Sequence, residues 1–194
     1  MNKPTPQALW GINSDISWQW HLNFIGQYQQ HNYYLYYVID RIMNQNSQIT
    51  KIIELGTGYG ALTMVLGLWG IKRNIPVYTV DIRPNKIEPI QNVLDCLKVI
   101  VLAKDIYSDE TTKYLQSIIG NEPVLMICDG LDKSIEMNTW VPLLPNNSIV
   151  CGHDYRTECI PEKIKDITDK HCIPFEEENW EKLNVQLVVY KKVK

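Results

Sequence analysis

The chain has 194 residues, of which 45% are hydrophobic and 21% are charged, a composition that fits a folded globular domain and excludes wholesale disorder. Its formal net charge of −3 gives no general attraction to phosphate backbones, so we do not expect a nucleic-acid partner. No apolar stretch reaches the roughly 20 residues that cross a bilayer, no signal-peptide core is visible, and the five cysteines form no CxxC pair. We therefore expect a cytoplasmic protein with no membrane partner and no disulfide framework.

Residues 1–48 differ from the rest because they are rich in Gln, Asn, Trp and Tyr. The segment HNYYLYYVIDRIM (31–43) has apolar side chains at helical spacing, which predicts a helix that docks on the following domain. We interpret residues 1–48 as an N-terminal helical extension that acts as a lid or as a homodimer contact. The aromatic side chains that could form such a lid are Trp18, Trp20, Tyr28 and Tyr33. Residues 49–194 are expected to form one ligand-binding domain.

From residue 50 onward, short β-branched runs alternate with helix-like patterns. The expected strands are KIIEL (51–55), VYTVD (77–81), VIVLA (99–103), PVLMICD (123–129) and SIVCGHD (148–154). This alternation predicts right-handed βαβ crossovers and a Rossmann-like, doubly wound α/β sheet with helices on both faces. After a helix expected over residues 161–171, the runs PFEEENW and LNVQLVVYKK are close together in the chain and predict an antiparallel C-terminal hairpin.

A glycine-rich loop, GTGYGA, follows the first expected strand. Glycines 56, 58 and 60 remove side chains where a ligand approaches, and the next helix points its positive end at the same place. Asp81 ends the second strand, where a carboxylate can accept hydrogen bonds from ribose hydroxyls. Together these features predict an adenosine-containing ligand.

The same loop also satisfies the dinucleotide fingerprint, so an NAD-linked oxidoreductase is an alternative. Glu54 precedes the glycines, and its carboxylate would repel a pyrophosphate but suits a cationic sulfonium ligand. The antiparallel hairpin also favours the sulfonium ligand.

With these motifs the sequence resembles the class I S-adenosylmethionine-dependent methyltransferases, through ELGTGYG, TVDIRP, KDIYS and MICDG. The resemblance runs from about residue 50 to the C-terminus and implies a seven-stranded sheet and S-adenosylmethionine as cofactor. It implies a cofactor site built from Glu54, Gly56, Thr57, Gly58, Tyr59, Gly60, Asp81, Ile82, Asp105 and Ile106. In it, Glu54 would border the methionine part, Asp81 the ribose and Asp105 the adenine. Gly60 could instead serve helix packing, and Asp105 could cap the next segment.

Two further strands end in acidic residues, Asp129 and Asp154. The carboxyl ends of neighbouring parallel strands meet at one edge of a sheet, and carboxylates that converge there suit a divalent cation or acid–base work. Residues 128–155 also resemble small O-methyltransferases of the catechol-type and cephalosporin-hydroxylase-related branch, in which such carboxylates bind magnesium. The resemblance therefore implies Asp129 and Asp154 as ligands of a divalent metal.

His153 departs from the catechol-type pattern, because histidine suits zinc, iron or manganese better than magnesium, or acts as a proton acceptor with no metal. Lys133 lies one helical turn after Asp129 and could neutralise or deprotonate a substrate hydroxyl, or it could be a solvated lysine. Asp132 and Glu136 are interpreted as first-turn acids without chemistry.

We expect Asp129, His153, Asp154 and Lys133 to be the catalytic residues of methyl transfer to an oxygen of a small-molecule or sugar-like acceptor. A cofactor-binding protein without catalysis and an NAD-linked oxidoreductase are the alternatives.

Overall fold

A computed structural model of the protein describes residues 22–24, 27–29, 34–83, 87, 90–175, 183 and 185–194. Within them, a seven-stranded sheet has the order β5-β4-β3-β6-β7-β9-β8. Its strands are β3 (Lys51–Leu55), β4 (Val77–Asp81), β5 (Val99–Ala103), β6 (Val124–Cys128), β7 (Ile149–His153), β8 (Cys172–Pro174) and β9 (Leu187–Lys192). The doubly wound sheet expected from the sequence is confirmed, including the seven strands that the resemblance implied.

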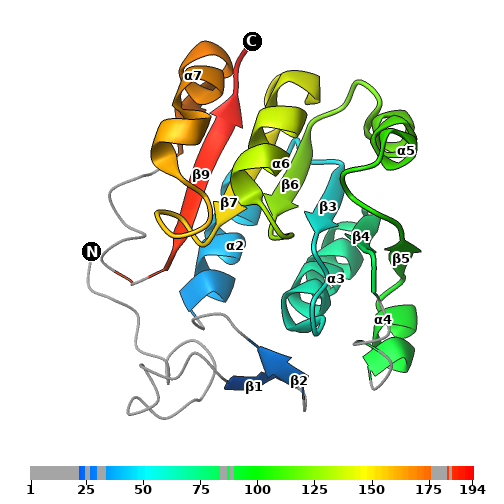
Figure 1. Ribbon diagram of the computed structural model, residues 1–194. Helices are drawn as coiled ribbons and strands as arrows, with labels where there is room; N and C mark the ends of the chain where they lie inside the picture. Colours follow the sequence, from blue (N-terminus) through cyan, green and yellow to red (C-terminus); the bar gives the residue numbers. More distant parts are fainter. Residues whose placement is uncertain are drawn as a thin grey trace.

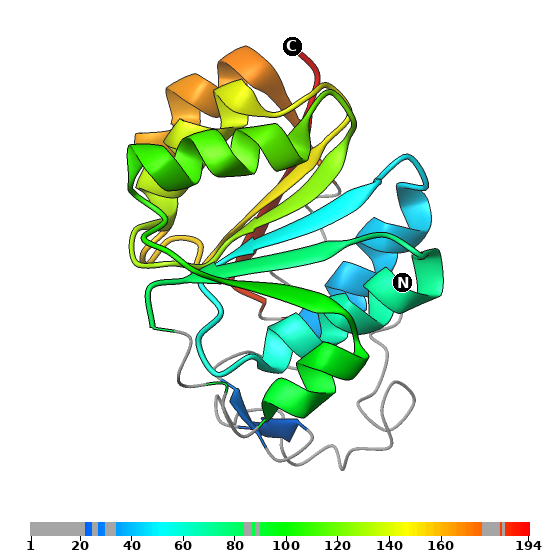
Figure 2. The same cartoon turned by 90° about the vertical axis from the view of Figure 1, so that its right-hand side faces the viewer.

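Helices cover both faces of this sheet, as Figures 1 and 2 show. The elements α2 (Tyr34–Gln45), α3 (Ala61–Arg73) and α4 (Gln91–Cys96) lie on one face, and α5 (Asp109–Ile119), α6 (Lys133–Trp140), the 3-10 turn η3 (Val141–Leu143) and α7 (Pro161–His171) lie on the other. Each face has its own apolar core, because alternate strand residues point in opposite directions: Ile52 packs in one core and Ile53 in the other. Within the described residues, no helix combines the length and the apolarity needed to cross a membrane.

Local sequence explains where the helices on the second face begin. The Ser108 side chain accepts a hydrogen bond from the Thr111 amide at the start of α5, and Asp132 accepts from the Ile135 amide at the start of α6. α7 begins with Pro161, whose missing N–H is not needed in the first turn. These caps fix the starts of α5, α6 and α7 directly beyond the strand ends.

The last strand enters the sheet between two others. β9 pairs antiparallel with both β7 and β8, so the reversed C-terminal strand and its hairpin are confirmed. The expected bounds of the hairpin are wrong, because β8 starts at Cys172, where the chain becomes extended directly after α7, and residues 175–186 connect it to β9. Most of the run PFEEENW lies outside the described residues.

The N-terminal segment is only partly helical. α2 confirms the helix, and its buried face includes Leu35, Val38, Ile39 and Ile42. Ahead of it, β1 (Leu22–Phe24) and β2 (Gln27–Gln29) form a two-stranded antiparallel hairpin, so a wholly helical extension is wrong for these residues. Backbone pairing of two three-residue runs, which contain β-favouring Phe24 and Tyr28, explains the difference. The expected aromatic lid lies outside the described residues and side chains.

One glycine of the loop after β3 is required by the fold itself. Gly56 has φ 91°, and a Cβ placed on it would lie 2.2 Å from the Asp129 carbonyl oxygen. The loops after β3 and β6 also share a hydrogen bond from the Asp129 amide to the Leu55 carbonyl, at 2.8 Å. Gly58 has φ 52°, but nothing lies within 4 Å of its Cβ position. The first glycine therefore serves the contact between two loops, whereas the second faces open space.

These two glycines predict different losses of stability. We expect Gly56→Ala to lower the free energy of unfolding by about 3 kcal/mol or more, because the new methyl group collides with backbone atoms. Gly58→Ala should cost only about 1 kcal/mol, the usual penalty of a left-handed conformation. Urea denaturation followed by circular dichroism measures both, and equal losses would contradict the assignment of Gly56 to the loop contact.

Candidate active site

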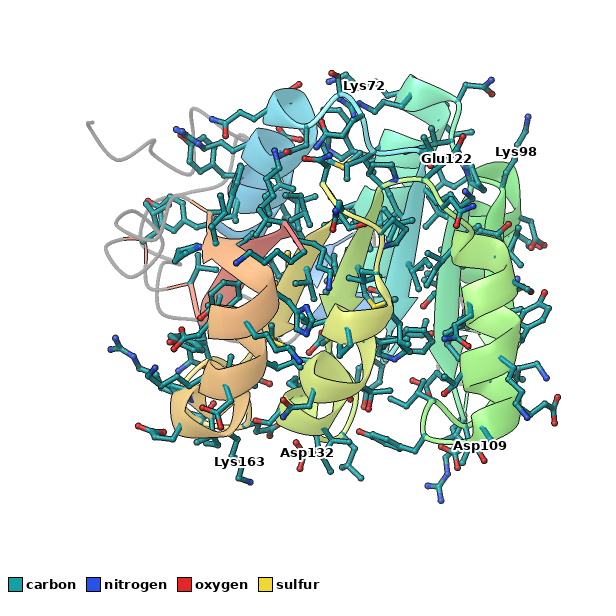
Figure 3. All side chains as sticks on the ribbon, turned by 90° about the horizontal axis from the view of Figure 1, so that it is seen from above. Lys72, Lys98, Asp109, Glu122, Asp132 and Lys163 are labelled. Carbon is teal, nitrogen blue, oxygen red and sulfur yellow. The ribbon has the colours of Figure 1, made fainter. Side chains whose placement is uncertain are left out.

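The site lies at the edge where the parallel strands end. In Figure 3, Asp109, Asp132 and Lys163, at or near the starts of α5, α6 and α7, lie along one edge of the molecule. Lys72, Lys98 and Glu122, which lie close in the chain to the starts of strands, are at the opposite edge (Figure 3). The first edge gathers the loops that follow β3, β4, β5, β6 and β7, and ligands of open α/β sheets bind outside such strand ends.

Glu54 lies beneath the glycine-rich loop and is 1% exposed. Its Oε2 accepts hydrogen bonds from the Thr63 and Thr79 hydroxyls, each at 2.6 Å. The Thr79 hydroxyl in turn contacts the hydroxyl of Thr57, a loop residue, at 2.6 Å. The resemblance implied that Glu54 and Thr57 border the cofactor. In the structure, both side chains belong to a buried hydrogen-bond network beneath the loop.

Burial in this network changes the acidity of Glu54. Desolvation raises the pKa of Glu54 from 4.5 to about 8, although the hydrogen bonds from Thr63 and Thr79 partly oppose that rise. The carboxyl group is therefore mostly protonated at neutral pH. Register explains why Thr79 reaches it: Glu54 in β3 is paired directly with Thr79 in β4.

Asp81, at the end of β4, binds the loop through its side chain. Its Oδ2 accepts from the Gly58 amide at 3.1 Å, and its Oδ1 accepts from the Arg83 amide at 2.8 Å. Tyr59 and Ile82 are exposed beside it. Gly60 begins α3 with φ 78°, and a Cβ there would lie 2.6 Å from the Ile90 side chain. Gly58 and Asp81 thus come together at the edge, while the contacts of Gly60 fit the packing role.

The loop after β5 is tied to the loop after β6 by residues that sequence reasoning missed. The Tyr107 hydroxyl donates to Glu136 Oε1 at 2.8 Å and accepts from the Asp132 amide at 2.7 Å, and Glu136 Oε2 accepts from the Gly130 amide at 3.1 Å. Glu136 is 2% exposed, and burial raises its pKa to about 7. Glu136 does lie in the first turn of α6, as expected from the sequence, but it is buried and connects two loops; its place on the α6 face that also buries Met137 was the available signal for that burial.

The two expected adenine contacts lie in that β5 loop. Asp105 Oδ1 accepts from the Tyr107 amide at 2.9 Å, and its carbonyl accepts from the Ser108 amide, so this aspartate does shape the turn before α5. The Ile106 side chain lies against Gly130, where a Cβ would be 2.4 Å from Ile106 Cδ1. Both residues are therefore at the same edge as Gly58 and Asp81.

The four expected catalytic residues form one cluster. His153 Nδ1 lies 3.0 Å from Asp129 Oδ1 and 3.3 Å from Asp154 Oδ1. Lys133 Nζ lies 3.2 Å from Asp154 Oδ2 and 4.0 Å from Asp129 Oδ1, and it also binds Glu158. The structure thus brings together the carboxylates after β6 and β7 with two basic groups.

Glu158 reaches this cluster through a tight turn. Asp154 and Arg156 have φ of 51° and 74°, and the Asp154 carbonyl accepts from the amides of Thr157, Glu158 and Cys159. The turn folds Glu158 back onto Lys133 at the start of α6. No periodic pattern in the sequence announces such a turn, which explains why Glu158 was missed.

The charges of neighbouring groups determine the pKa values of the residues in this cluster. Burial alone would lower the pKa of His153, but Asp129 and Asp154 outweigh it and raise the pKa to about 10. Burial also opposes the charge of Lys133, yet the hydrogen bond that Lys133 donates to Glu158 and the charges of Asp129 and Asp154 raise its pKa above the usual value. For Asp154, burial is outweighed by His153 and Lys133, which hold its pKa well below the usual range. At neutral pH both nitrogen groups therefore act as hydrogen-bond donors.

The expected metal ligands do converge. Asp129, His153 and Asp154 each offer a ligand atom within 4.8 Å of the others, a set of two carboxylates and an imidazole that suits manganese, iron or zinc better than magnesium. However, the Lys133 ammonium lies among the same carboxylate oxygens. As arranged, the cluster does not fit a divalent ion in addition to Lys133, and metal binding stays a prediction.

Glu54 predicts how stability changes with pH. Because its pKa is raised in the folded state, its stabilising effect is full below about pH 4.5 and is lost as pH rises through about 8. The difference in unfolding free energy between Glu54→Gln and wild type should therefore grow in favour of the variant by about 1.4 kcal/mol per pH unit across that window. Urea titrations at several pH values measure it, with exposed Glu162→Gln as the control for loss of one negative charge. A pH-independent difference would contradict the buried acid.

Comparison with known proteins identifies structural neighbours only. No protein-family model and no curated protein matches the chain. Among solved structures, CmcI described as Mg-SAM has a TM-score of 0.68 at 12% identity over 89% of this chain and 77% of its own, and apo CmcI has 0.70 at 13% over 89% and 76%.

A Staphylococcus aureus protein described as a candidate caffeoyl-CoA O-methyltransferase has a TM-score of 0.57 at 12% identity, over 81% of this chain and 82% of its own. At such identities the similarity shows the fold alone. The resemblance to class I S-adenosylmethionine-dependent methyltransferases is confirmed at that level: this chain has their fold.

Proposed function

We propose that this protein is an S-adenosylmethionine-dependent methyltransferase that acts on an oxygen of a small-molecule or sugar-like acceptor. The observation that carries the proposal is the contact between Gly56 and the Asp129 carbonyl, because it sets the loop expected to bind the cofactor directly beside the acidic cluster. The fold shared with CmcI, described with Mg-SAM, and with a candidate O-methyltransferase supports the same reaction class.

The cofactor side favours a sulfonium ligand over a dinucleotide. Backbone at Gly58 faces open space beside Asp81, whose carboxylate suits ribose hydroxyls. Glu54, which is mostly protonated at neutral pH, supports the loop from below and does not supply charge to the ligand. β9 runs antiparallel between β7 and β8, whereas the dinucleotide-binding sheet has the order 3-2-1-4-5-6 without such a strand. The glycine-rich loop alone fits both ligands, and the order of the sheet favours the sulfonium ligand.

On the acceptor side, the chain's own residues position an oxygen and receive its proton. S-adenosylmethionine, when bound, supplies an electrophilic methyl group, and in-line attack by the acceptor oxygen is mainly a matter of orientation. Asp129 and Asp154 can each accept a hydrogen bond from an acceptor hydroxyl. Because Lys133 and His153 hold the pKa of Asp154 well below its usual range, Asp154 orients the hydroxyl and Asp129 is the carboxylate that takes its proton. The cytoplasmic location and the homodimer expected from the sequence remain part of this proposal.

The cofactor assignment predicts a loss of binding from a small change. We expect Gly58→Ala to weaken S-adenosylhomocysteine binding at least about tenfold, because a methyl group would occupy the space where the ligand approaches the backbone. Gly120→Ala is the matched control, since Gly120 also has a positive φ, 61°, and nothing within 4 Å of its Cβ position, but caps the far end of α5. Isothermal titration calorimetry measures both. Tight NADH binding with no S-adenosylhomocysteine binding would overturn the assignment.

The catalytic assignment predicts that binding and turnover separate. With a panel of phenols, catechols and sugars, wild type should release S-adenosylhomocysteine, and Asp129→Asn should lower the rate at least about 100-fold while cofactor affinity changes little. Asp132→Asn is the control, because asparagine caps a helix as well as aspartate does. Tight cofactor binding with no turnover on any acceptor would favour the non-catalytic alternative.

A further inference from the structure

We propose that the Lys133 ammonium occupies the cation position between Asp129, Asp154 and Glu158, so that this protein uses an internal lysine where a divalent metal would otherwise bind. The inference rests on the proposed function in one respect, that this cluster is the acceptor side of the site. Its central claim, that lysine and metal exclude each other, can be measured without turnover.

The ammonium is surrounded by carboxylates. Lys133 is 5% exposed, and its Nζ lies 3.2 Å from Asp154, 4.0 Å from Asp129 and in direct contact with Glu158. An ammonium group carries three hydrogen-bond donors, and three carboxylates face it, Asp129 from the loop after β6 and Asp154 and Glu158 from the turn after β7. A divalent ion bound by Asp129 and Asp154 would stand next to this charge in a partly buried setting, where repulsion between like charges is screened less than at an exposed surface.

The backbone at Lys133 is held in place by hydrogen bonds of the next residue. Lys133 is the first residue of α6, and the next residue, Ser134, ties the helix to the turn that carries Glu158. The Ser134 hydroxyl donates to the Glu158 carbonyl at 3.2 Å and accepts from the Ile160 amide at 2.8 Å. The start of α6 and the 154–160 turn thus form one unit, and the lysine side chain remains directed at the carboxylates.

His153, the remaining expected metal ligand, also contacts carboxylates. The His153 Nδ1 that could bind a metal instead lies between Asp129 and Asp154, at 3.0 and 3.3 Å. A divalent ion would therefore have to displace Lys133 from oxygens that the histidine also contacts. Removal of the lysine charge should leave Asp129, His153 and Asp154 as a vacant set of metal ligands.

The test is Mn²⁺ binding, followed by electron paramagnetic resonance of the free ion at fixed ionic strength. Wild type should show no saturable site, whereas Lys133→Met should bind one Mn²⁺ with a saturable isotherm over the same concentration range. Lys133→Arg keeps the charge and should behave as wild type. Lys165→Met, which removes an exposed lysine paired with Asp169, is the matched control and should also behave as wild type.

Further variants separate the outcomes. The double variant Lys133→Met, Asp129→Asn should lack the new site. If Lys133→Met does not fold, Lys133→Gln takes its place, because the glutamine amide is uncharged but can still form hydrogen bonds with carboxylates. One tight Mn²⁺ in wild type that Asp129→Asn removes, or no gain in either uncharged variant, would overturn the proposal. S-adenosylhomocysteine binding by the same proteins is measured separately, so failure of the proposed function would appear there and not in the Mn²⁺ titration.

Discussion

The close approach of two backbone segments governs the arrangement of this site. β3 and β6 are neighbours at the centre of the sheet, and the loops that leave them touch where Gly56 meets the Asp129 carbonyl. There is no space for a Cβ between them, so the distance from the glycine-rich loop to the acidic cluster is set by main-chain contact and not by adjustable side chains. Both halves of the site are therefore attached to neighbouring strands near the centre of the sheet.

Three acidic groups at this edge of the sheet are of two kinds, according to how their charge is compensated. Glu54 and Glu136 lie under loops, receive hydrogen bonds from hydroxyl or amide groups, and have raised pKa values because burial dominates. Asp154 lies beside Lys133 and His153, and its pKa is lowered because opposite charge dominates. The first kind shapes the loops, and the second presents ionised oxygen at the edge where a substrate would approach.

Periodicity predicted most of the fold because its strands are short, β-branched and separated by amphipathic helices, as in KIIEL and VYTVD. It placed Asp129, His153, Asp154 and Lys133 correctly at one edge, since that follows from parallel strands alone. It could not show that Glu54 is buried under Thr57, because this depends on pairing with Thr79 across strands. Nor could it find Glu158, whose position depends on the left-handed backbone conformation of Asp154 and Arg156. It also missed the β1–β2 hairpin, whose three-residue strands are too short to show an alternating hydrophobic pattern.

The place of β9 has a consequence for the order in which the chain can assemble. β7 supplies His153 to the acidic cluster, yet one side of β7 is paired only by β9, with His153 opposite Leu187. During synthesis the half of the sheet that carries the glycine-rich loop can form early, whereas the edge of β7 stays open until residues 187–192 have left the ribosome. The cofactor half can thus be built before β9 has been made, and the acidic half is completed only after residues 187–192 have been added.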